Sequence, residues 1–369
     1  MKALQIHAGA GARRHLRERG LRPGDVRVVP AAAGGPKGLV LNPLDRYLFG
    51  EWFADGVGAV HLLGASIGAW RMACACLPDA DAAFVQMAHD YTHQNYEHAP
   101  GKAPAPRHVS EVFGATLAQR FGGREAQVLG HPRFRLHVFT SRGRHVLRRE
   151  GRALSSISTP LAYLGAFATN VLSRRAMGAW LERVIFSDPR DPLPLRLHDY
   201  RTHTANLSAA NLCPSVLASC SIPFWLDAVR DIAGAPRGAY WDGGITDYHL
   251  HLDYASMNAT TADGASFGLV LYPHFQASVI PGWLDKSLQH RHRATPRLDN
   301  VIVVSPTPEW IASLPGAKLP DRSDFKRFGD DLAARVEAWS RAVGESERLR
   351  DEFAAWASGS RHIDVQPLV

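Results

Sequence analysis

A serine set between two glycines, in the pattern Gly-x-Ser-x-Gly at residues 64–68, constrains this 369-residue chain more than any other short stretch. Before it, residues 60–63 are mostly apolar, as in a short buried strand. After it, residues 67–77 lack proline and are rich in Ala, Met, Cys and Leu, which favours a helix. The stretch therefore predicts a strand, a sharp turn and a helix, an arrangement that presents the oxygen of Ser66 as a nucleophile.

The same pattern recurs at residues 264–268, but its surroundings differ. Residues 260–265 are typical of a loop, and residues 267–272 of a buried strand that ends at a proline. A serine that enters a strand is not held in a strand-to-helix turn. We therefore interpret Ser266 as the start of a strand and Ser66 as the candidate nucleophile.

Strand-like and helix-like stretches alternate along the chain, which predicts an α/β sandwich. No internal repeat or low-complexity linker interrupts them, so we expect one domain over residues 1–369, with a core at about 26–305 and a helical segment at 325–357. The other expected elements are strands at residues 26–29, 134–139 and 300–304 and helices at residues 40–48, 84–97 and 109–121.

The composition is that of a globular protein with a sizeable core, since 46% of the residues are hydrophobic and 21% are charged. The N-terminal residues have no apolar signal-peptide core, no run of 18 apolar residues suggests a membrane span, and the four cysteines lack a zinc-finger spacing. We expect a cytoplasmic protein with reduced, largely buried thiols. The net charge of +7 comes without a nucleic-acid-binding module, so no nucleic-acid partner is expected.

A charge contrast marks residues 133–175 as a possible insertion. Residues 133–152 hold seven arginines and one glutamate, residues 153–172 hold no charged residue, and Arg174 and Arg175 follow. One interpretation is a lid or interfacial element that lies on a lipid surface, giving peripheral membrane contact. The other is a buried helix with Pro160 near its start.

A nucleophilic serine needs a proton acceptor, and the histidines offer one answer. In a Ser-His-Asp arrangement His249, His251 or His274 would take the proton, although none stands in a distinguishing motif. His249 and His251 with Asp247 or Asp253 would also suit a metal ion, but strand alternation explains that pattern more simply.

An aspartate offers a second answer. Residues 238–241 resemble a short strand that runs into Asp242-Gly243-Gly244, shortly after the sequence ASCSIPFWL at residues 218–226. A carboxylate held in a tight turn at a strand end is able to bond the serine hydroxyl directly and act as the base. The alternative is an ordinary Asp-Gly turn of the kind expected at residues 55–56.

A glycine-rich loop at residues 33–38, Ala-Gly-Gly-Pro-Lys-Gly, follows the first expected strand. Its glycines permit backbone conformations that direct N–H groups into one concavity, which would stabilise an oxyanion. A phosphate-binding P-loop is the rival interpretation, but Lys37 is followed by Gly38 rather than Ser or Thr, and the spacing differs.

In this order, the glycine-rich loop, the Ser66 turn and the Asp-Gly-Gly turn resemble the patatin-like phospholipases, over about residues 26–244. The resemblance implies a three-layer α/β/α fold with a mostly parallel sheet and a Ser66–Asp242 dyad. It also implies an oxyanion loop at Gly34 and Gly35, with Lys37 and Gly38 beside them, and hydrolysis of lipid acyl esters without a metal or cofactor. One departure is Ala33, which stands where the family pattern has its first glycine.

We therefore expect a serine acyl hydrolase of the phospholipase A or lysophospholipase type that acts through an acyl-enzyme. Two alternatives remain open: a Ser-His-Asp esterase of small soluble esters, and a lipid-binding or scaffold protein of the same fold with little catalysis. The oligomeric state, the lipid head group and the acyl chain length are not determined by these patterns.

Overall fold

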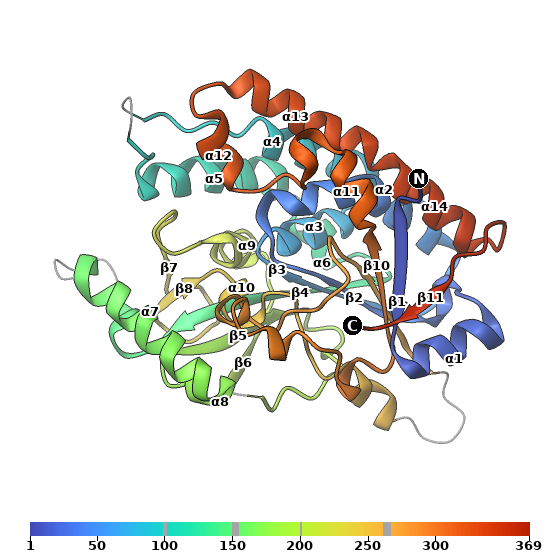
Figure 1. Cartoon of the computed structure of the whole chain (residues 1–369). Coiled ribbons are helices and arrows are strands. Elements are labelled where there is room, and N and C mark those ends of the chain that lie inside the picture. Colours follow the sequence, from blue (N-terminus) through green and yellow to red (C-terminus); the bar gives the residue numbers. More distant parts are fainter. Residues whose placement is uncertain (99–101, 150–154, 200, 261–266) are drawn as a thin grey trace.

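A mixed β-sheet runs through the structure, a computed structural model that describes residues 1–98, 102–149, 155–199, 201–260 and 267–369 (Figure 1). Its main path follows the order β11-β1-β10-β9-β2-β3-β4-β5-β6, and β8 pairs with both β4 and β7. The strands are β1 (Leu4–Ala8), β2 (Val26–Ala31), β3 (Val60–Ala65), β4 (Phe134–Gly143), β5 (Leu181–Ser187), β6 (Thr202–Asn206), β7 (Val229–Arg230), β8 (Ala239–Trp241), β9 (Leu269–Pro273), β10 (Val301–Pro306) and β11 (Val365–Pro367).

The five consecutive strands β10, β9, β2, β3 and β4 are parallel to one another. Antiparallel pairs join β1 to β10, β4 to β5 and β8, and β7 to β8. Every residue of β3 and β10 is buried, as expected for parallel strands that are covered on both faces.

Helices flank this sheet on both sides, with α2, α3, α4 and α13 on one side and α1, α7 and α8 on the other (Figure 1). The α/β prediction with a mostly parallel central sheet is therefore confirmed. The helices are α1 (Ala10–Arg19), α2 (Asn42–Gly50), α3 (Ile67–Ala75), α4 (Ala80–Thr92), α5 (Pro106–Phe121), α6 (Glu125–Leu129), α7 (Ser155–Leu172), α8 (Arg174–Met177), α9 (Leu212–Cys220), α10 (Gly244–Asp247), α11 (Pro308–Ser313), α12 (Ser323–Phe328), α13 (Leu332–Glu345) and α14 (Glu347–Ala357).

Helix α3 follows β3 directly and lies in the core. All nine of its residues are buried, and one of them, Arg71, forms a bidentate ion pair with the buried Asp45 of α2, at 2.7 and 2.8 Å. A buried guanidinium requires such a partner, since an unpaired charge in the core costs several kcal/mol. The pair holds α3, the helix that follows Ser66, against α2.

The bounds of several elements differ from the sequence-based expectation. The segment at residues 33–38 was expected to be a loop, but a 3-10 helix, η2 (Gly35–Leu41), begins inside it and leads into α2. The helix expected at 84–97 starts earlier and ends earlier, and residues 325–357 fall into parts of three helices, α12, α13 and α14. Local helix propensity located these segments but not their ends, which depend on caps and tertiary contacts.

The expected insertion does not begin at residue 133, because β4 occupies residues 134–143 and lies between β3 and β5. The sheet also extends beyond the expected core of 26–305, since β1 and β11 pair with each other and β1 pairs with β10. All four cysteines are free, and three of them are buried. In the described part of the chain, no helix combines the length and apolar character needed to cross a bilayer.

Candidate active site

Ser66 occupies a strained turn between β3 and α3. Its φ is +57°, a left-handed conformation that costs a residue with a side chain of order 1 kcal/mol or more. The glycines on either side are required by packing: a Cβ on Gly64 would clash with the backbone of Ala69, and one on Gly68 with the carbonyl of Ala31. The predicted strand, turn and helix are confirmed, and the glycines allow α3 to pack closely against β2 and β3.

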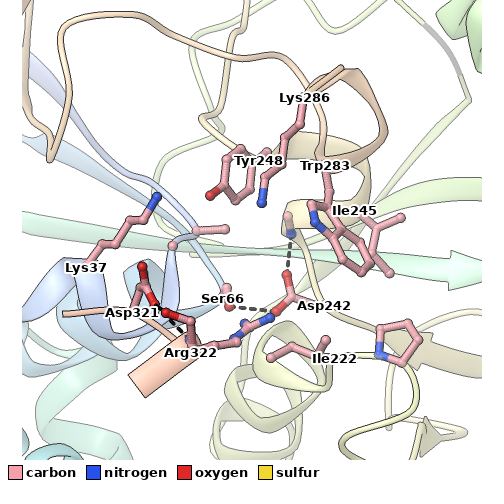
Figure 2. A pocket seen from close by; sticks show the side chains of 15 residues that line it. Lys37, Ser66, Ile222, Asp242, Ile245, Tyr248, Trp283, Lys286, Asp321 and Arg322 are labelled. Atoms are coloured by element: carbon pink, nitrogen blue, oxygen red, sulfur yellow. Dashed lines mark hydrogen bonds between the residues drawn. The ribbon is translucent and has the colours of Figure 1, made fainter. Parts of the chain in front are cut away.

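The register of the sheet brings Ser66 and Asp242 together. Strand β3 runs parallel to β4 and ends with Ala65 opposite Phe139, while β8 runs antiparallel to β4 with Trp241 opposite Ser141. The residues that follow these two strands are Ser66 and Asp242. Both therefore lie beside the same position of β4, the one between Phe139 and Ser141. Ser66 Oγ donates a hydrogen bond of 2.6 Å to Asp242 Oδ2 (Figure 2).

A second serine holds this turn in place. Ser219, near the end of α9, accepts a hydrogen bond from the Ser66 amide at 2.8 Å and donates one to the carbonyl of Phe139 at 2.7 Å. Its backbone carbonyl also accepts the amide of Gly243 at 3.1 Å. Ser219 thus links the Ser66 turn, strand β4 and the Asp-Gly-Gly turn, and it belongs to the ASCSIPFWL stretch.

The carboxyl group of Asp242 is buried and oriented from both sides. Its Oδ1 accepts the amide of Gly244 at 2.7 Å while Oδ2 faces Ser66. Burial raises the pKa of this carboxyl above its usual value, and the hydrogen bond from Ser66, Arg322, the Gly244 amide and Lys286 oppose part of that rise. A carboxylate with a raised pKa is a stronger base, which suits proton transfer from a hydroxyl.

The glycine-rich loop contributes to one wall of the same pocket. Gly34 and Lys37 line it, whereas Gly35 turns the chain with a φ of +57° and Gly38 packs against Ile67 of α3. Because η2 begins at Gly35, the amides of its first turn have no acceptor within the helix. Gly38 therefore has a packing role in the structure and does not line the pocket.

The side chain of Ala33 fits because residue 244, which packs against it, is a glycine. A Cβ on Gly244 would lie 2.5 Å from the Cβ of Ala33, so the alanine methyl occupies space that a side chain at 244 would need. The Ala33 amide also donates to the carbonyl of Tyr248 at 2.9 Å. The loop and the Asp242 turn are thus packed directly against each other.

Residues from the C-terminal third, which carried no motif, complete the pocket around Ser66. The cavity measures about 240 Å³ and has cationic side chains from three separate segments, namely Lys37, Lys286 and Arg322 (Figure 2). Burial, together with Lys37 and Arg322, lowers the pKa of Lys286 to about 8. Only an alignment of related sequences or the tertiary structure could have identified Lys286 and Arg322 as pocket residues, because a single lysine or arginine has no local sequence signature.

The histidines considered as proton acceptors lie elsewhere. None lines the Ser66 pocket, and among the described residues Asp242 is the partner of Ser66 Oγ. His249 is buried and accepts the amide of Ile280 through Nδ1 at 3.0 Å, and burial lowers the pKa of His249, His251 and His274. In the described residues no group of three or more His, Cys, Asp or Glu side chains is arranged to hold a metal ion. Ser266 lies outside the described residues.

A second, larger cavity of about 560 Å³ adjoins the first and shares Ile222 and Arg322 with it. Apolar and aromatic side chains form much of its lining, and charged side chains form the rest. The first group includes Tyr91, Tyr96, Val109, Trp225, Leu226 and Phe325, and the second includes Lys102, Lys326, Asp330 and Arg335. A cavity of this size is within the range of small-molecule sites. The smaller cavity thus contains Ser66 and three cations, and the larger one beside it contributes most of the aromatic surface.

Helix α7 presents apolar side chains to the solvent near this site. Leu164, Val171 and Leu172 are exposed, whereas Asn170 is buried and donates to Asp285 Oδ1 at 2.8 Å. Asp285 is the residue before Lys286, so α7 is attached to the segment that lines the pocket. Residues 153–154, and the side chains up to residue 163 with Pro160 among them, lie outside the described part. In its described half, α7 is not a fully buried helix.

No protein-family model matches the chain, and no curated protein matches it in sequence. Similar solved structures include VipD from Legionella pneumophila, at 13% identity and a TM-score of 0.36, over 95% of this chain and 70% of that one. Human GIVD cytosolic phospholipase A2 is 11% identical with a TM-score of 0.37, over 94% of this chain and 62% of that one. Both TM-scores lie below 0.5, a level at which we infer neither family nor activity from the likeness.

Proposed function

We propose that this protein is a serine acyl hydrolase that cleaves carboxylic esters of lipids, of the phospholipase A or lysophospholipase type, through Ser66 and Asp242. The observation that carries the proposal is the 2.6 Å hydrogen bond from Ser66 Oγ, in a left-handed turn at the start of α3, to a buried carboxylate. Nucleophile and base are within direct reach of each other, as nucleophilic catalysis requires.

The reaction proceeds in two halves. Asp242 accepts the hydroxyl proton as Ser66 Oγ attacks the ester carbonyl, and the carbonyl oxygen becomes an oxyanion. The amides of Gly34 and Gly35 stabilise that charge, assisted by the N-terminus of α3. The protonated Asp242 then gives its proton to the leaving alcohol, which leaves an acyl group on Ser66. In the second half water attacks the acyl carbonyl while Asp242 accepts its proton. The bond to Ser66 Oγ then breaks, Asp242 returns the proton to Ser66 Oγ, and the fatty acid is released.

The apolar and aromatic side chains of the larger cavity favour a lipid over a small soluble ester. This cavity opens beside the nucleophile at Ile222, where an acyl chain attached to the reacting carbonyl would extend. Burial of each methylene contributes about 0.8 kcal/mol, so a cavity of this size rewards a long chain. The exposed apolar residues of α7 would then contact the lipid surface from which the substrate is drawn, as a peripheral interaction.

Fluorophosphonate labelling tests the nucleophile. We expect the wild type to be labelled, Ser66→Ala to lose the label and Ser266→Ala to keep it. Asp242→Asn, which keeps the side-chain shape but removes the base, is expected to lower nitrophenyl ester turnover roughly 10²–10⁴-fold. A wild type that binds vesicles but takes no label would overturn the proposal in favour of a lipid-binding protein. Turnover that survives Asp242→Asn and is lost with a single histidine would favour the Ser-His-Asp esterase.

A further inference from the structure

Three cations, Lys37, Lys286 and Arg322, line the Ser66 pocket, and in the described part of the chain none of them forms an ion pair within 4.0 Å. Most other partly buried arginines in this protein are paired. Instead, the Lys286 ammonium lies 4.0 Å from the centre of the Tyr248 ring, and that of Lys37 lies 5.4 Å from the centre of Phe275. A partly buried cation without a counterion is unfavourable for stability, so this cluster requires another explanation.

The two carboxylates of the pocket offset only part of this charge, because they are fewer than the three cations and one of them is already paired outside the cluster. Of the two, Asp321 is paired with Lys318 at 2.8 Å and bonded to Ser323, and Asp242 is engaged by Ser66 and the Gly244 amide. The cations also repel one another: Lys37 and Arg322 help burial to lower the pKa of Lys286, and Asp242 opposes that fall only in part. The pocket therefore has an excess of positive charge beside the nucleophile.

We propose that Lys286 and Arg322, with Lys37 on the third side, bind a negatively charged phosphate or carboxylate group that the substrate carries close to its scissile ester. This inference rests on the proposed hydrolase function and names the class of ester that the site prefers. It assigns a role to two residues from segments that bear no motif.

The geometry limits where that charge can be. The cations belong to the same cavity of about 240 Å³ as Ser66, so the anionic group and the ester carbonyl must be near each other in the substrate. A guanidinium presents a planar fork to an oxyanion group and an ammonium acts as a point charge, so together they hold it from different directions. A neutral hydroxyl in its place would leave the cations unpaired.

A different role for the cations is to keep Asp242 ionised, because Arg322 and Lys286 both lower the pKa of its carboxyl. That role would affect anionic and neutral substrates alike. The ratio of kcat/KM for an anionic ester to that for its neutral counterpart therefore separates the two roles.

The experiment compares Lys286→Gln and Arg322→Gln with the wild type on two matched pairs of substrates. One pair is an octanoyloxy-nitrobenzoate and the neutral nitrophenyl octanoate, and the other is a monoacylglycerol phosphate and the corresponding monoacylglycerol. Arg17→Gln, which removes one charge from the exposed surface of α1, is the control for net charge. Circular dichroism and thermal unfolding establish that each variant is folded.

We expect each pocket variant to lower the anionic-to-neutral ratio by about tenfold or more, the size of one hydrogen bond to a charged group, and Arg17→Gln to leave it unchanged. A fall confined to the phosphate pair assigns phosphate as the ligand, and one confined to the nitrobenzoate pair assigns a carboxylate. Equal losses on both members of each pair, or an unchanged ratio, overturn the inference while turnover of the neutral ester still supports the hydrolase. Absence of turnover and of fluorophosphonate labelling in the wild type would instead refute the proposed function.

Discussion

Ser219 is expected to hold the turn that carries Ser66, and replacing it with alanine tests this directly. The hydroxyl is fully buried, accepts the Ser66 amide at 2.8 Å and donates to the Phe139 carbonyl at 2.7 Å. Ser219→Ala removes both hydrogen bonds and leaves the amide of a buried residue without an acceptor. An unsatisfied buried donor costs about 1–3 kcal/mol and the second bond about 1 kcal/mol, so we expect a loss of about 2–4 kcal/mol in the free energy of unfolding.

A matched control lies one turn earlier on the same helix. Ser215 is equally buried, but its hydroxyl donates at 2.8 Å to the carbonyl of Leu212 within α9 itself. Backbone bonding of the helix also uses that carbonyl, so Ser215→Ala leaves no buried donor unsatisfied and is expected to change stability by less than about 1 kcal/mol.

Urea unfolding and steady-state turnover measure the two consequences. Because Ser219 positions Ser66 without touching the substrate, Ser219→Ala should lower kcat while KM changes little, and a displacement of about 1 Å in the nucleophile corresponds to roughly a hundredfold loss. The reasoning would be refuted if Ser219→Ala and Ser215→Ala were equally stable and equally active.

Three further predictions follow from the packing and charge of the site. Gly244→Ala should destabilise the protein by about 1–3 kcal/mol, because its methyl would meet Ala33, and Ala33→Gly in the same chain should restore part of the loss; strictly additive unfolding energies would contradict this. Activity should fall on acidification, because protonated Asp242 cannot act as a base, and the midpoint should lie above the ordinary aspartate pKa of about 3.9, because burial raises the pKa of Asp242. A midpoint at or below that value in a profile of kcat/KM against pH would argue against Asp242 as the base. Trp225→Ala should lower the ratio of kcat/KM for a long-chain ester to that for a butyryl ester by about fivefold, from the loss of about 1 kcal/mol of apolar contact, and an unchanged ratio would place the acyl chain elsewhere.

The turn at Ser66 was predictable because its causes are local. A short apolar run, two small residues and a proline-free stretch favour a strand, a tight turn and a helix within some 18 residues of chain. The clashes that a side chain at Gly64 or Gly68 would produce involve segments that this turn itself brings close, or the neighbouring strand β2. The fold class was predictable for a similar reason, since hydrophobic periodicity alternates along the chain.

The limits of the elements were less predictable. The arginines suggested an insertion from residue 133, although the alternation over residues 134–139 already indicated a strand. In the structure that strand occupies residues 134–143 and lies inside the sheet. Arg135 illustrates why: it pairs with Asp191, a residue that only the fold brings within reach. Charge along the chain does not distinguish a solvated arginine from one with a distant partner.

The sequence by itself determined that a serine and an aspartate stand in tight turns at strand ends, because turn geometry depends on neighbouring residues. It nominated Asp242 but could not place it beside Ser66, from which it is separated by 176 positions. That placement depends on strand register, since β3 and β8 run in opposite directions along β4 and end at the same point. The convergence of Lys286 and Arg322 on the pocket likewise depends on the packing of distant segments, which only the tertiary structure decides.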